Sequence, residues 1–261
     1  MRAFIGSLSK PFYLVGTVSI LLAWELVAVR TLRILPGLRE VGISLLLLAE
    51  TGELWRQLGI SLQRSLTGLT VGAALGFFTG AAAGFSAPIY YLLKPLVGAL
   101  LSAPAVVLVM LSMVWFGIGS FTATFVTAVF TVPIMYVSVV EGMAMVDRDL
   151  LEMASVYRIS RWSVWWNIYL PALATAILTG LAFAAGTAFR KTVMAELLGS
   201  NDGIGYAMAM TRFSLDAARF FAWVAVCLAV AVAVEISFVR PIARRMNRWR
   251  QPSGAAGVAY E

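Results

Sequence analysis

The sequence predicts an all-α integral membrane protein with about six transmembrane helices, and three observations support this class. Hydrophobic residues make up 61% of the 261 positions, and the mean hydropathy is +0.87. Charged residues make up 13%, whereas soluble domains carry about 25%. The apolar residues gather in runs that reach about 20 residues, the length of helix that crosses a hydrocarbon core. Most of the chain is therefore expected to lie in a lipid bilayer.

Six apolar runs define the predicted spans. They lie near residues 11–29, 65–86, 95–116, 120–140, 170–189 and 220–239. The first resembles the apolar part of a signal peptide, but it is long for one and no A-x-A cleavage site follows, so we interpret it as a helix. Residues 95–140 are uncharged, which is too long a run for one crossing, and the glycines of "FGIGS" (Phe116 to Ser120) are expected to turn the chain. The stretch "VGISLLLLA" before the second span is too short to cross and is expected to be interfacial or re-entrant.

We interpret residues 1–250 as one transmembrane domain and residues 251–261 as a C-terminal tail. The stretch "RPIARRMNRWR" after the last span carries five arginines, which the positive-inside rule places in the cytoplasm. Five arginines between residues 30 and 64 would then lie outside, against the rule, and the density of the tail outweighs them. With six spans, both termini and the loop over residues 147–169, between the fourth and fifth spans, are expected in the cytoplasm.

The composition excludes several kinds of chemistry. The chain has no histidine, so a Ser-His-Asp triad and a zinc-protease helix are excluded, and its one cysteine, Cys227, allows no disulfide framework and no thiolate metal site. No phosphate-binding G-x-x-x-x-G-K-[ST] loop occurs. The net charge of +7 comes from basic residues at the ends of spans, which report orientation in a membrane, so no nucleic-acid partner is expected. We therefore expect no catalytic residue, no cofactor and no metal site.

Glycines recur every four residues in the second span. They are Gly68, Gly72, Gly76, Gly80 and Gly84. On a helix they form one stripe without side chains, which lets another helix backbone approach closely in a membrane. The stripe serves packing within this chain or a contact between subunits. Leucine in the stripe is expected to disrupt that packing, and alanine is expected to be mild.

The loop over residues 147–169 has the pattern of two short amphipathic helices. The polar face of the first carries Asp149, Glu152, Ser155 and Arg158, and its apolar face carries Leu150, Ala154 and Tyr157. Ser160 is the expected N-cap of the second helix. That helix gathers Trp162, Trp165, Trp166 and Tyr169 on a face suited to the lipid headgroup layer. Pro171 is expected to end it or to begin the fifth span. A loop that only lies on the membrane would show the same pattern.

This loop resembles the signature of the inner-membrane permease subunits of ATP-binding-cassette importers, in particular the nitrate, sulfonate and taurine branch. The Glu-Ala-Ala element of that signature stands here as Glu152, Met153 and Ala154, and the Ile-x-Leu-Pro ending as Ile168, Leu170 and Pro171. Residues 92–120 and the stretch "MAELLGSNDGIGYAM" (194–208) add to the resemblance, which covers most of the chain.

Two residues depart from the signature, Met153 for the first alanine and Arg158 for the glycine. Because that glycine often has a positive φ, which is costly for arginine, the turn is expected to use ordinary dihedrals or to move onto Ile159 and Ser160. The alternative is that Arg158 contacts the partner ATPase.

The resemblance implies a transport subunit, not an enzyme, in a bacterial inner membrane. It implies a cytoplasmic ATP-binding subunit, an extracytoplasmic substrate-binding protein and a second permease subunit, identical or paralogous, which together import a small organic or inorganic anion or a related small metabolite. The residues expected to couple to the ATPase are Leu150, Glu152, Ala154, Ser155, Tyr157, Arg158 and Pro171. The alternative class is a secondary transporter or channel without an ATPase partner.

Two adjacent cations, Arg190 and Lys191, follow the uncharged residues 167–189. Adjacent residues diverge by about 100° on a helix, so at most one is expected to face a central pathway and favour anions there. The alternatives are that they reach the outer interface as flexible side chains or pair with Glu196 inside the fold.

Overall fold

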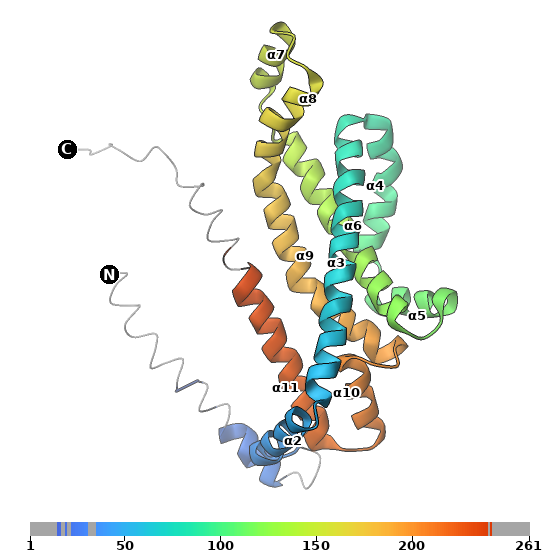
Figure 1. Cartoon of the computed structure of the whole chain (residues 1–261), viewed down its shortest axis with the longest axis vertical. Helices are drawn as coiled ribbons and strands as arrows, with labels where there is room; N and C mark the ends of the chain where they lie inside the picture. The colour runs from blue at the N-terminus through green and yellow to red at the C-terminus, as the bar shows by residue number, and fades with distance from the viewer. Residues whose placement is uncertain (1–14, 17–18, 20–21, 31–34, 240, 242–261) are drawn as a thin grey trace, which may run out of the picture.

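The computed structural model describes residues 15–16, 19, 22–30, 35–239 and 241, and every regular element among them is helical (Figure 1). The predicted all-α class is therefore confirmed. The helices that follow residues 22–30 are α2 (Leu38–Glu50), α3 (Glu53–Phe85), α4 (Ala87–Ser102), α5 (Ala105–Phe116), α6 (Ser120–Ala144), α7 (Arg148–Val156), α8 (Arg161–Val164), α9 (Leu170–Gly199), α10 (Ile204–Phe213) and α11 (Ala217–Val234), with π-helical turns at Trp165–Tyr169 and Glu235–Val239.

Four helices in the described part are long and apolar enough to cross a membrane. They are Glu53–Phe85, Ser120–Ala144, Arg161–Gly199 and Ala217–Ser237, and the bent pair α4–α5 makes a fifth if it counts as one span. Of the first predicted span, 11–29, the structure describes residues 15–16, 19 and 22–29, and the rest lies outside the described residues. The predicted count of six is thus not reached in the part of the chain that the structure describes.

The helices extend past the charges that bounded the predicted spans. α3 begins at Glu53 rather than near residue 65, and α9 ends at Gly199 rather than near residue 189. The added turns carry Gln57, Arg64 and Glu196, which are all buried. Because these polar side chains bond to one another inside the protein, they do not end the helices as solvated charges would.

The predicted third span, 95–116, is two helices that meet at 105°, α4 and α5. The break lies at Ala103 and Pro104, whose backbones are extended (ψ 131° for each). Proline disfavours a helical conformation in the residue before it and donates no hydrogen bond, which explains the break. The turn predicted at "FGIGS" does end α5, with Gly117 at φ +74° and Gly119 at φ +158°.

The glycines of α3 face α6. A Cβ added to Gly72 would lie 2.5 Å from the carbonyl oxygen of Ala128, and one added to Gly76 would lie 2.5 Å from that of Val132. The backbones of α3 and α6 are thus in close contact within one chain. This geometry contradicts the expectation that alanine is mild at these positions, because the methyl group alone would displace the α6 backbone.

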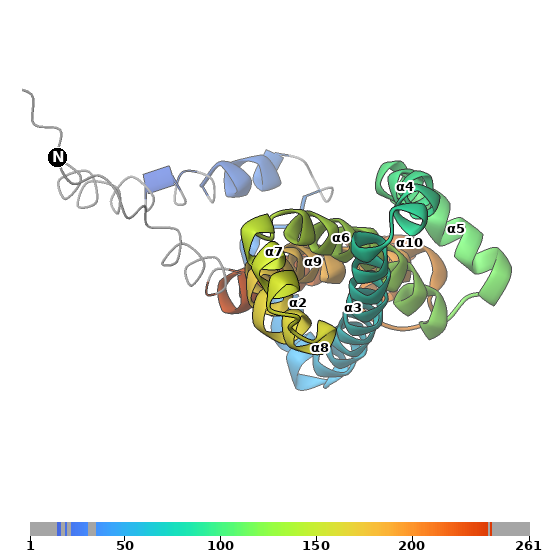
Figure 2. The same cartoon turned by 90° about the horizontal axis from the view of Figure 1, so that it is seen from above.

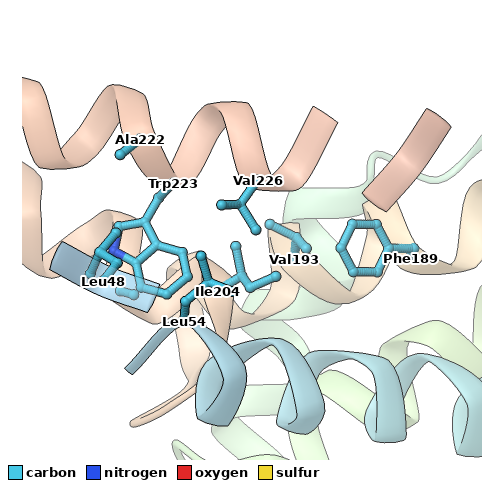
Figure 3. Packing of buried hydrophobic residues seen from close by; sticks show 9 residues of the cluster. Leu48, Leu54, Phe189, Val193, Ile204, Ala222, Trp223 and Val226 are labelled. Carbon is cyan, nitrogen blue, oxygen red and sulfur yellow. The ribbon is translucent and has the colours of Figure 1, made fainter. Parts of the chain in front are cut away.

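The α2–α10 end of the molecule holds the largest apolar cluster (Figure 3). Trp223 of α11 is fully buried there between Leu48 of α2, Leu54 of α3 and Ile204 of α10. The α7–α8 segment lies at the opposite end of the long axis (Figure 1). Seen from above, α3, α6 and α9 form the centre and α5 extends away from it (Figure 2). The three central helices therefore connect two structurally different ends.

Candidate functional site

The segment over residues 147–169, here called the α7–α8 segment, projects beyond the ends of the long helices (Figure 1). The Asp147 carboxylate accepts a hydrogen bond from the backbone N–H of Asp149 at 2.9 Å and caps α7. The Ser160 hydroxyl accepts from the N–H of Ser163 at 3.2 Å, so Ser160 is the N-cap of α8, as the sequence predicts. Both helices begin at side chains that satisfy otherwise free N–H groups.

The turn between α7 and α8 places Arg158 at φ +51°. The expectation that the turn would avoid a positive φ at this residue is therefore wrong. The N–H of Ile159 donates to the carbonyl of Ala154 at 2.9 Å, and the N–H of Arg158 donates to that of Ser155 at 3.1 Å. These two bonds form the helix-ending motif usually made with glycine, and they offset a conformational cost of about 1–2 kcal/mol for a residue with a Cβ.

The expected coupling residues are mostly accessible. Leu150, Glu152, Ser155, Tyr157, Arg158 and Pro171 are all exposed. Ala154 is 3% exposed, so the chain itself already covers the methyl group that was expected to contact a partner. The exposed apolar side chain at the corresponding turn is Met153, which with Leu150 and Tyr157 makes an apolar stripe at i, i+3 and i+7. The i, i+3 spacing could have identified Met153, but the match of Ala154 to the family signature favoured its neighbour.

Aromatic contacts attach this segment to α3. The ring of Tyr169 lies 5.1 Å from that of Phe85 and the ring of Trp165 lies 5.6 Å from it, whereas Trp162 and Trp166 are exposed. The four aromatic residues therefore do not form the single predicted face, because two of them pack on α3 and two lie on the surface. The π-helical turn joins α8 to α9 so that residues 161–199 form one continuous helix through Pro171. A displacement of α8 can therefore be transmitted directly to α9.

A group of polar side chains is buried among α3, α6, α9 and the loop before α10. Arg64 donates to the Glu196 carboxylate at 2.9 Å, and the Ser61 hydroxyl donates to the same carboxylate at 2.7 Å. Arg64 also pairs with Asp202, and Gln57 accepts from the N–H of Gly203 at 2.6 Å. Arg64 is 4% exposed and Glu196 is fully buried. We call this group the Arg64–Glu196 cluster.

Arg64 was not identified from the sequence as a member of a buried polar cluster. Its signal is the spacing of Gln57, Ser61 and Arg64 at i, i+4 and i+7, which places three polar side chains on one face of α3. The structure does not bring Glu196 together with Arg190 or Lys191, because its carboxylate is directed to Arg64 and Ser61. The interpretation in which Glu196 pairs with these two cations is therefore wrong.

The two adjacent cations differ in surroundings. Arg190 is exposed, and Lys191 is half-buried with its Nζ 4.3 Å from the centre of the Phe130 ring on α6. No carboxylate of the described residues forms an ion pair with Lys191. Of the three residues named for the pathway, Glu196 is bound within the fold, Arg190 lies on an open face and Lys191 meets α6.

Comparison with known proteins agrees with this architecture. Residues 72–248 match the family described as the binding-protein-dependent transport system inner membrane component. The chain is 30% identical to a Bacillus subtilis protein named as an aliphatic sulfonates transport permease, SsuC, over 88% of this chain and 84% of that protein. It is 28% identical to the taurine transport system permease TauC of Escherichia coli, over 90% and 88% of the two chains.

Solved structures with the same fold are more distant in sequence. A chain of an amino acid ABC transporter matches with a TM-score of 0.62 and 16% identity, covering 77% of this chain and 96% of that one. A chain of a bacterial transporter for the acidic polysaccharide alginate matches with a TM-score of 0.60 and 14% identity, covering 96% and 100%. These matches show the fold alone. The family match over residues 72–248 and the 30% identity to SsuC establish that this chain belongs to the permease components of binding-protein-dependent ATP-binding-cassette importers.

Proposed function

We propose that this chain forms half of the translocation pathway of an ATP-driven importer for a small organic anion of the sulfonate or taurine type. The substrate class is supported by the names of the relatives, which are permeases for aliphatic sulfonates and for taurine. The single observation that carries the mechanism is the projecting α7–α8 segment, which is capped at both helix starts and continuous with a membrane-spanning helix.

In this proposal α7 docks into a groove of a separate ATP-binding subunit. The exposed stripe of Leu150, Met153 and Tyr157 has the spacing with which amphipathic helices bind apolar grooves. Glu152 and Arg158 supply polar contacts around that stripe. The chain has no phosphate loop of its own, so ATP is hydrolysed on the partner. Pairwise closure of two ATP-binding subunits then moves α7, and the continuous helix over residues 161–199 carries this motion to α6 and α3.

The family match supports two further partners in this proposal. An extracytoplasmic binding protein delivers substrate at the α2–α10 end, and a second permease chain, identical or paralogous, completes the pathway. The α7–α8 end and both termini lie in the cytoplasm, and the complex lies in the bacterial inner membrane. The five arginines of the C-terminal tail support this orientation.

The test is uptake by proteoliposomes that contain the permease, its ATP-binding subunit and its binding protein. Radiolabelled taurine and ethanesulfonate are offered outside, with ATP or a non-hydrolysable analogue enclosed. Uptake that requires hydrolysable ATP is expected. Uptake by the permease alone, driven by an ion gradient, would instead support a secondary transporter.

A further inference from the structure

Lys191 of α9 holds its charge beside the middle of the membrane-spanning helix α6. Its Nζ lies 4.3 Å from the centre of the Phe130 ring, and Phe130 is the midpoint of the uncharged residues 120–140 of α6. At 1.5 Å of rise per residue, the ring lies about 15 Å of helix from either end of that segment. The same register is fixed by the hydrogen bond of 2.8 Å between the buried hydroxyls of Thr127 and Thr192. The lysine does not reach an interface at either end of α6.

This charge has no counter-charge within the described part of the chain. The ion pairs found there join Arg64 to Glu196 and Asp202, and Arg219 to Glu53. The face of Phe130 attracts the ammonium group, but a ring quadrupole compensates a buried cation only in part. An uncompensated cation at this depth is costly in hydrocarbon, so such residues almost always face a water-filled cavity or the interior of a bundle.

A second observation, on α5, argues against lipid around this helix. Val109 and Met113 of α5 pack with Val126, Ala195 and Phe130, so α5 lies beside the ring that contacts Lys191. At the start of α5, the backbone is extended at Ala103 and Pro104. Backbone outside helices is tolerated at membrane depth only where protein or a water-filled cavity covers it. The broken helix is thus the same helix, α5, that packs beside the ring contacting Lys191.

From these observations we infer that Lys191, and not Arg190, is the cation that meets the transported anion. The inference rests on the proposed function and specifies which residue of the pathway recognises the substrate. A sulfonate presents three oxygen acceptors around one negative charge, and a lysine ammonium presents three donors around one positive charge. The passing anion supplies the counter-charge that the fold leaves out.

The test measures the local electrical potential and needs neither substrate nor ATP. In a Cys227→Ser background, which has no other cysteine, Thr187→Cys places a thiol one helical turn from Lys191 on the same face. Thr187 is half-buried, and its hydroxyl donates to the carbonyls of Phe183 and Ala184 of its own helix, so a cysteine replaces it with little change of shape. Vesicles of both orientations that carry the assembled transporter are treated with anionic sulfonatoethyl methanethiosulfonate or with cationic trimethylammonioethyl methanethiosulfonate.

We expect both reagents to reach Cys at position 187, with the anionic reagent favoured. Lys191→Gln should lower the ratio of anionic to cationic modification rates by on the order of tenfold, since a unit charge about 5 Å away in water changes each rate several-fold in opposite directions. Lys191→Arg should preserve the ratio. The matched control is Arg190→Gln, which removes the adjacent charge. Residue 190 also lies one turn from position 187, at i+3, but Arg190 is exposed and its charge is screened by ions, so the ratio should change less than with Lys191→Gln.

Three results would overturn the inference: no modification by either reagent in any variant, an unchanged ratio with Lys191→Gln, or an equal effect of Arg190→Gln. Co-purification of each variant with the ATP-binding subunit verifies assembly. The outcomes are separable from the proposed function as a whole. A chain that acted without an ATPase could still show the charge dependence, whereas loss of ATP-dependent uptake in the unmodified protein would contradict only the importer mechanism.

Discussion

At the scale of single residues, two positions keep conformations or charges that membrane proteins usually avoid. Arg158 has a positive φ at the end of α7, and Arg64 is a buried cation inside a network of hydrogen bonds. In both cases neighbouring groups offset the cost. The helix-ending hydrogen bonds stabilise Arg158, and the carboxylates of Glu196 and Asp202 neutralise Arg64. Substitutions at these residues separate backbone effects from side-chain effects.

We expect Arg158→Gly to rigidify the turn, because glycine adopts a positive φ without the cost of about 1–2 kcal/mol that a Cβ brings. Hydrogen exchange of the amides of α7 should slow, whereas Arg158→Val should accelerate it. Binding of the ATP-binding subunit is the second measurement. If the Arg158 side chain contacts that subunit, Arg158→Gly weakens binding although the turn is more stable, and Arg158→Lys retains most of it. Unchanged binding by all three variants would exclude such a contact.

Removal of one partner of the Arg64–Glu196 pair should strongly lower the free energy of unfolding. Glu196→Met leaves a buried guanidinium with one partner fewer, and a loss of about 3–5 kcal/mol in the free energy of unfolding is expected. The double variant Arg64→Met with Glu196→Met should recover part of this loss, because no uncompensated charge remains. Thermal unfolding in detergent measures both.

The control for this pair is the half-exposed pair of Arg219 and Glu53. Water screens that pair, so Glu53→Gln should cost no more than about 1 kcal/mol. Equal losses at the buried and the half-exposed pair would show that the Arg64–Glu196 cluster is solvated in the native protein.

At the scale of helices, the contact between α3 and α6 depends on the glycines of α3, which have no side chain to keep the two backbones apart. The glycines of α3 allow the carbonyl oxygens of α6 to approach to distances that a methyl group would occupy. Hydrophobicity does not drive such helices together in lipid, so this close packing supplies much of the association. The contact is therefore sensitive to very small additions.

Gly72→Ala and Gly76→Ala should each lower the free energy of unfolding by about 1–3 kcal/mol through overpacking. Gly59→Ala, in the same helix, is the matched control, since a Cβ there meets nothing within 4 Å. Alanine at that position should be neutral or should stabilise the helix by up to about 1 kcal/mol. Thermal unfolding of the three variants provides the comparison. Equal tolerance at all three positions would contradict the close contact between the backbones of α3 and α6.

At the scale of the whole molecule, the α7–α8 segment lies at one end and the α2–α10 cluster at the other, with α3, α6 and α9 between them (Figure 1). The helix over residues 161–199 runs from the first end to the Arg64–Glu196 cluster near the second. A displacement of α8 can therefore reach the Arg64–Glu196 cluster through one continuous helix.

Reversal of the charge at Glu152 should uncouple the helix over residues 161–199 from ATP hydrolysis by the partner subunit. Glu152 is exposed on α7, so Glu152→Lys is not expected to change membrane insertion or thermal stability. Co-purification with the ATP-binding subunit and ATP-dependent uptake should both fall at least tenfold, because the docking surface would present the wrong charge. Glu141→Lys, a charge reversal at an exposed residue outside α7, is the control. Normal uptake by Glu152→Lys would show that α7 docks by another face.

The sequence by itself determined the all-α membrane class, the turn at Phe116–Ser120, the N-cap at Ser160 and the two short helices of the α7–α8 segment. Each of these depends on local rules: apolar run length, glycine conformation, side-chain capping and amphipathic periodicity. Tertiary structure decided the features that depend on residues far apart in the chain. Arg64 lies 132 positions from Glu196, so no local pattern shows that the pair neutralises itself and lets α3 and α9 extend beyond their apolar runs. Likewise, the sequence does not show which of the adjacent cations, Arg190 or Lys191, faces a neighbouring helix. The packing of α9 on α6 half-buries Lys191 against Phe130 and leaves Arg190 exposed.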